Sequence, residues 1–165
     1  GKIGVKDSVL LKNGPFTPEE RSAMNEHTTK TLAILEKFHF SNKLSNVPIL
    51  ATYHHEKVNG QGYPFGLTGD ELPLASKILA VADVFDALTS RRDYPKYVEN
   101  ETMGFEPMSF QKVIGILKAD RGSHFDPEVV DVFFRCMPKV LRFYRGKHLP
   151  PEYVDGAISL LDAEN

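Results

Sequence analysis

Two adjacent histidines, His54 and His55, stand shortly before a stretch, Gly60–Pro73, that is rich in glycine and proline. Such a stretch is too irregular for a helix or a strand. Histidine is the commonest metal ligand among side chains. Glycine lets a backbone approach a phosphate closely, because it has no Cβ. The pattern therefore predicts metal ligands beside a loop that binds a phosphoryl group.

The rest of the chain carries helix signals. Thr17, followed by Pro18 and Glu20, predicts a helix start with a capping box, and Asp126 before a proline predicts another. Apolar residues recur at helical spacing in predicted helices at 17–38, 41–55, 74–88, 109–119, from 126 onward and 152–161. Pro48 lies either in an early turn of the second helix or at a break before it. No strand alternation and no internal repeat is evident, so the sequence predicts an all-α fold.

Composition excludes several classes of protein. The 165 residues, 41% of them hydrophobic, suit one domain with a real core. A net charge of −2 provides no basic footprint for duplex nucleic acid. The single cysteine, Cys136, permits no intrachain disulfide and no Cys-type zinc site, which favours a reducing cytoplasm. No apolar run reaches the length of a membrane span, and no signal peptide is visible.

The segment His54–Pro73, with its Gly-Tyr-Pro triplet, resembles the signature of the HD-GYP family. These bacterial phosphodiesterases of cyclic di-GMP belong to the HD superfamily of metal phosphohydrolases. Ala80–Ser90, Gly1–Gly4 and Gly122–Pro127 also fit. The resemblance implies an HD-domain helical bundle over residues 1–133, with 134–165 as a helical extension packed on it. In the family a His-Asp dyad lies two residues before the Gly-Lys-Ile-Gly segment, so we expect this chain to lack the dyad and the N-terminal helices of the domain.

Carried over residue by residue, the resemblance implies the metal ligands His27, His54, His55 and Asp83. Adjacent helical residues point about 100° apart, so His54 and His55 are expected to reach two neighbouring ions rather than one. Asp83 lies in an otherwise apolar helix, where a carboxylate is costly unless it is paired or bound to metal. Each residue alone is more often an ordinary core or surface residue, and the motif makes ligation the favoured interpretation. Two or three divalent ions are implied, with iron or manganese expected.

The resemblance also implies substrate contacts. Lys2 is expected to be catalytic, by stabilising the charge of the scissile phosphate. The expected substrate-binding residues are Gly60, Gly62, Tyr63 and Arg92. The family's Asp-Arg-Pro-Tyr-Arg stretch reads Arg-Arg-Asp-Tyr-Pro-Lys at residues 91–96, so a changed substrate affinity or base preference is expected.

Three further histidines, His39, His124 and His148, receive no catalytic role. His124 is expected to help Asp126 order the start of the following helix. Residues Val98–Pro107 are expected to be an insertion relative to the family.

The first functional interpretation is metal-dependent hydrolysis of cyclic di-GMP, or a related 3′,5′-cyclic dinucleotide, to linear pGpG or GMP in cytoplasmic bacterial signalling. The second is a catalytically incomplete module that binds a cyclic dinucleotide or a partner such as a GGDEF-type diguanylate cyclase domain. The expected lack of the dyad and the changes at Arg91 and Pro95 favour this second interpretation. A third is phosphohydrolysis of another nucleotide, against which the specific loop argues.

Overall fold

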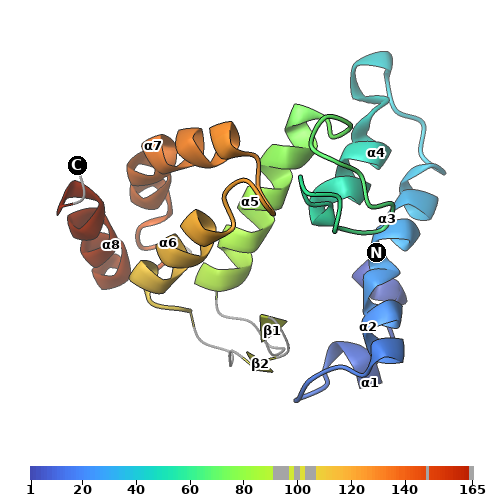
Figure 1. Cartoon of the computed structure of the whole chain (residues 1–165), viewed down its shortest axis with the longest axis horizontal. Coiled ribbons are helices and arrows are strands. Elements are labelled where there is room, and N and C mark those ends of the chain that lie inside the picture. Colours follow the sequence, from blue (N-terminus) through green and yellow to red (C-terminus); the bar gives the residue numbers. More distant parts are fainter. Residues whose placement is uncertain (91–96, 99–100, 103–106, 148, 164–165) are drawn as a thin grey trace.

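The computed structural model describes residues 1–90, 97–98, 101–102, 107–147 and 149–163. The described chain is mostly helical (Figure 1), which confirms the predicted all-α fold. Its elements are η1 Lys2–Gly4, α1 Asp7–Leu10, α2 Pro18–Asn25, α3 His27–Leu35, η2 Asn42–Leu44, α4 Val47–Thr52, η3 Tyr53–His55, α5 Leu74–Thr89, β1 Tyr97–Val98, β2 Glu101–Thr102, α6 Phe110–Ala119, α7 Pro127–Tyr144 and α8 Pro151–Ala163. The short antiparallel pair β1–β2 was not predicted; it pairs Tyr97 with Thr102. Most of the expected insertion lies outside the described residues.

Both predicted helix starts are confirmed. The Thr17 hydroxyl accepts a hydrogen bond from the Glu20 N–H at 3.3 Å, and the Glu20 carboxylate accepts one from the Thr17 N–H at 2.7 Å. The Asp126 carboxylate caps α7 by accepting the N–H groups of the second and third helical residues. The expected help from His124 was wrong, because its Nδ1 faces the Asp120 carboxylate at 3.6 Å, while Asp126 pairs with Lys77 at 2.9 Å.

Two of the predicted helices are divided in the structure. The helix expected over 17–38 splits at Glu26 into α2 and α3, so that His27 opens a new helix instead of lying inside one. The helix expected over 41–55 becomes η2, α4 and η3, with Pro48 in the first turn of α4. These divisions place His27 at the start of α3 and the pair His54–His55 at the end of η3.

The main core lies in the C-terminal half. Buried apolar side chains of α5, α6, α7 and α8 form one cluster, and α5 crosses the molecule to link this cluster with the N-terminal helices (Figure 1). Among residues 1–73 the buried hydrophobic residues are only Val5, Val9 and Leu72. Since buried apolar surface is the main stabilising contribution to a fold, the N-terminal half depends more on other interactions. No helix of the described chain combines the length and the apolar character needed to cross a bilayer.

The C-terminal half contains an internal repeat, so the expectation of none was wrong. Residues 121–131 (RGSHFDPEVVD) and 145–155 (RGKHLPPEYVD) agree at R, G, H, P, E, V and D, which is 7 of 11 positions. Arg121 holds Asp131 through two hydrogen bonds of 2.8 and 2.7 Å, and Arg145 holds Asp155 through two of 2.9 and 2.8 Å. The repeat thus builds the same corner before α7 and again before α8. Because α7 continues past residue 133, the predicted division there falls inside one helix, and it stays a prediction.

Candidate metal centre

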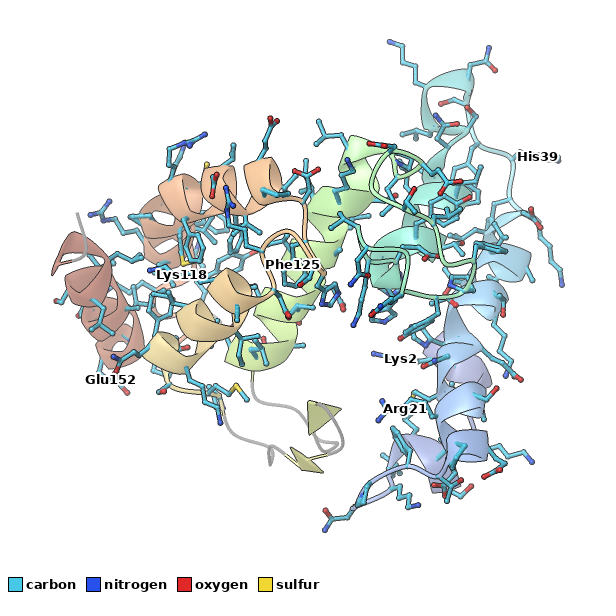
Figure 2. All side chains as sticks on the ribbon, viewed as in Figure 1. Lys2, Arg21, His39, Lys118, Phe125 and Glu152 are labelled. Carbon is cyan, nitrogen blue, oxygen red and sulfur yellow. The ribbon has the colours of Figure 1, made fainter. Side chains whose placement is uncertain are left out.

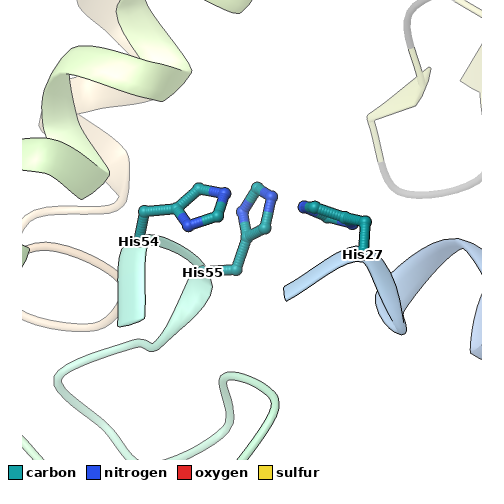
Figure 3. A group of neighbouring side chains, drawn as sticks. All are labelled: His27, His54 and His55. Atoms are coloured by element: carbon teal, nitrogen blue, oxygen red, sulfur yellow. The ribbon is translucent and has the colours of Figure 1, made fainter. Parts of the chain in front are cut away.

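Three of the predicted ligands come together in the structure. His27 begins α3, while His54 and His55 end the η3 turn that follows α4, and α3 packs against α4. Each histidine offers one ring nitrogen, and these nitrogens lie within 4.8 Å of one another. Figure 3 shows the three rings side by side. The rings of His54 and His55, expected to diverge, have centroids only 4.1 Å apart, and both residues lie in a 3₁₀ turn instead of the expected α-helix.

Hydrogen bonds orient two of these rings. The Nδ1 of His27 lies 2.7 Å from the Met24 carbonyl oxygen, and the Nδ1 of His54 lies 2.7 Å from the Ala51 carbonyl oxygen. A carbonyl only accepts, so each Nδ1 carries the proton and each Nε2 keeps its lone pair for a metal. The Nε2 of His27 is buried and has no hydrogen-bond partner among the described residues. A buried nitrogen without a partner is unfavourable, and a bound metal ion would satisfy it.

Burial favours the neutral form of two of the three rings, those of His27 and His55. Desolvation lowers the pKa of His27, and the neighbouring Lys2 and His54 charges lower it further. Desolvation also lowers the pKa of His55 to about 2, with added contributions from His54, His27 and Lys2. A metal binds the unprotonated imidazole, so His27 and His55 are held in their metal-binding form at neutral pH.

These pKa shifts predict that the metal-free protein loses stability in mild acid. Histidines in the unfolded chain titrate near pH 6.5, so below this pH the unfolded state binds a proton at His55 and the folded state does not. The contribution of neutral His55 to the free energy of unfolding is complete above pH 6.5. It falls as the pH drops toward 2, by about 1.4 kcal/mol per pH unit for one such group. Urea unfolding with chelator at pH 7 and 5.5 measures it. The His55→Ala variant should lose less unfolding free energy between these pH values than wild type. An equal loss in both proteins would contradict the lowered pKa of His55.

The loop after the histidines is held by Glu56, which the sequence reasoning missed. This carboxylate is 1% exposed and accepts the N–H of Phe65 at 2.7 Å and the N–H of Leu67 at 3.0 Å. The signal available in the sequence was an acidic residue directly after the two histidines. Glu56 thus fixes the loop that carries Tyr63 to the helical turn that carries His55.

The two predicted glycines, Gly60 and Gly62, are needed in the loop for different physical reasons. A Cβ at Gly62 would lie 2.3 Å from the Lys57 nitrogen and 2.4 Å from the Glu56 Cα, so only glycine allows the two backbone segments to cross. Gly60 adopts φ of 75°, a conformation that favours glycine. Both glycines therefore shape the loop, and their contact with substrate stays a prediction.

Tyr63 is packed against the histidines. Its ring stacks on His55 with centroids 4.9 Å apart and meets His27 edge-on at 6.4 Å. Desolvation raises the pKa of Tyr63, and the Asp83 charge raises it further, whereas the Arg21 charge lowers it. The phenol therefore stays protonated and can donate a hydrogen bond.

Of the remaining predicted site residues, the structure describes Asp83 and Lys2. Asp83 is half-buried on α5 and close enough to act on Tyr63, but it lies outside the group formed by the three histidines. The chain around Lys2 packs on α3, since a Cβ on Gly1 would overlap the His27 carbonyl. Figure 2 shows Lys2 near the end of α3 at which His27 begins the helix. Arg92 lies outside the described residues.

Comparison with known proteins identifies a family and several relatives. The family model described as HD domain matches residues 1–129. The chain is 42% identical over 141 residues to a "Probable cyclic di-GMP phosphodiesterase" of Vibrio cholerae, covering 81% of this chain and 29% of the relative. It is 40% identical over 152 residues to a "Cyclic di-GMP phosphodiesterase" of Thermotoga maritima, covering 87% and 36%. It is 35% identical over 133 residues to "3'3'-cGAMP-specific phosphodiesterase 2" of Vibrio cholerae, covering 80% and 23%. The chain thus spans about a third or less of the length of these relatives.

Proposed function

Because this chain belongs to the HD domain family, we propose that it is a metal-dependent phosphodiesterase that hydrolyses cyclic di-GMP or a related 3′,5′-cyclic dinucleotide. The observation that carries the proposal is the group of three histidines with the buried, unpartnered Nε2 of His27. The names of the relatives support cyclic dinucleotides as the substrate class. The geometry supports metal binding, because neutral imidazoles with fixed Nδ1 protons are suited to it.

The proposed roles follow from position. His27, His54 and His55 would hold the metal, with Asp83 as a further proposed ligand. A bound divalent metal would polarise the phosphodiester and lower the pKa of a water molecule. Lys2, whose charge already acts on His27 and His55, is proposed to stabilise the negative charge of the reacting phosphate.

The loop would exclude water and orient the substrate. Tyr63 covers one face of His55, and its protonated hydroxyl is proposed to donate a hydrogen bond to substrate. Gly60 and Gly62 are proposed to let the loop backbone approach the substrate, and Arg92 to bind phosphate or base.

The metal ions, the cellular location and the protein partners are further parts of the proposal. Two or three ions, with iron or manganese as the metal, are compatible with imidazole and carboxylate ligands. We also propose that the protein acts in the bacterial cytoplasm and that GGDEF-type diguanylate cyclase domains are partners.

The test is turnover by protein loaded anaerobically with Fe²⁺ or Mn²⁺ and supplied separately with cyclic di-GMP, 3′3′-cGAMP and 3′,5′-cyclic GMP. We expect linear dinucleotide or mononucleotide products from the cyclic dinucleotides, and no turnover with chelator. Binding of a cyclic dinucleotide without any turnover would instead favour the catalytically incomplete module. Preference for the cyclic mononucleotide would overturn the proposed substrate class.

A further inference from the structure

Two cationic side chains lie on one side of the N-terminal helices. Figure 2 shows Lys2, from η1, and Arg21, from α2, on the side turned toward α5 and α6. Lys2 has been assigned to the reacting phosphate, whereas Arg21 has no role in the function proposed above. Its position on the same side as Lys2 therefore needs an explanation.

The helix that carries Arg21 is firmly held. Its first turn has the Thr17–Glu20 capping box, and Glu20 also pairs with Lys12 from the preceding segment. The Arg21 guanidinium lies over the ring of Phe16, 5.1 Å from its centroid. An arginine that rests on an aromatic face is pre-organised, so it loses less side-chain freedom when it binds an anion.

Arg21 and Lys2 occupy different places on this side of the molecule. Lys2 follows Gly1, which packs so closely on α3 that a Cβ there would overlap the His27 carbonyl. Arg21 lies on α2, which leads through Glu26 directly into α3. Positive charge is therefore supplied at two positions, one beside the start of α3 and one on α2 (Figure 2).

A cyclic dinucleotide also presents two negative charges, one on each phosphodiester of its ring. Only one phosphodiester reacts at the metal in a given turnover, and the other needs a cation elsewhere. The planar guanidinium of arginine binds two phosphate oxygens at once. We propose that Arg21 binds the second, unreacting phosphate of the cyclic dinucleotide, an inference that rests on the proposed function.

The test compares a substrate that has two phosphates with one that has a single phosphate. Metal-loaded wild type, Arg21→Gln and Arg21→Lys are assayed with cyclic di-GMP and with bis(p-nitrophenyl) phosphate. In Arg21→Gln we expect KM for cyclic di-GMP to rise roughly 10- to 100-fold, the size expected for a lost hydrogen bond to a charged group. The ratio of kcat/KM values for the two substrates should fall by a similar factor, and Arg21→Lys should recover part of it. Arg142→Gln, which changes an exposed arginine of α7, is the matched control.

The outcomes separate this inference from the proposed function. If wild type does not hydrolyse cyclic di-GMP or 3′3′-cGAMP, the proposed function fails and the inference falls with it. If wild type is active and Arg21→Gln leaves the ratio of the two kcat/KM values unchanged, the inference alone is overturned. An equal loss on both substrates would show that Arg21 acts through the fold of the site, which also overturns it.

Discussion

Replacing His55 with alanine is expected to abolish stoichiometric metal binding and most of the activity. The ring of His55 lies close to three other rings of the site, with centroid distances of 4.1 Å to His54, 5.0 Å to His27 and 4.9 Å to Tyr63. Loss of an outer-shell partner of a metal ligand costs roughly 10- to 100-fold in affinity or activity. Loss of a ligand itself should cost more. Metal content by mass spectrometry and kcat on a cyclic dinucleotide measure the effect.

The matched control is His39→Ala, because His39 is exposed and lies outside the metal group. It should keep the metal content and activity of wild type. A His55→Ala protein that still binds one or more ions per chain with wild-type turnover would contradict the ligand assignment. Metal should also raise the melting temperature of wild type, since few apolar side chains are buried in residues 1–73 and binding energy adds directly to folding.

The Glu56→Ala variant is expected to lose much of the stability that holds the loop 60–73 in place. The carboxylate is the acceptor for two backbone N–H groups, those of Phe65 and Leu67, and it is 1% exposed. Each hydrogen bond to a charged group contributes about 1.5–3 kcal/mol, so a total loss of about 3 kcal/mol or more is expected. Since Tyr63 is carried by the same loop, activity should fall as well.

Urea unfolding and hydrogen exchange of the Phe65 and Leu67 amides measure this effect. The control is Glu71→Gln within the loop itself, because the exposed Glu71 carboxylate accepts hydrogen bonds from Thr68 alone among the described residues. Exposed hydrogen bonds compete with water, so Glu71→Gln should alter stability little. Equal losses in Glu56→Ala and Glu71→Gln, or unchanged exchange at Phe65, would show that Glu56 does not hold the loop.

Sequence reasoning succeeded where the deciding interaction is local. The Thr17 box and the Asp126 cap each join residues within one turn, so residue type and spacing are enough to predict them. It did less well at helix divisions. The break at Glu26 and the 3₁₀ turn at His54–His55 depend on packing between helices, which no spacing rule contains.

The repeated corner shows a different limit. The shared residues of 121–131 and 145–155 are present in the sequence, but their meaning becomes clear only when Arg121–Asp131 and Arg145–Asp155 are seen as equivalent ion pairs. Each arginine meets an aspartate that lies 10 residues later in the chain, in the helix that follows the corner.

The sequence by itself determined the all-α fold, the helix starts and the succession of two histidines and a glycine-rich loop, because these follow from local propensity and motif. The family resemblance already implied that His27, His54 and His55 share one site, and the tertiary structure brings their rings together. Only the tertiary structure decided that Glu56 is buried beneath the loop and that Arg21 lies on the same side as Lys2. These contacts join segments far apart in the chain. Their formation depends on how α2, α3 and α4 pack together, and that packing is a property of the whole fold.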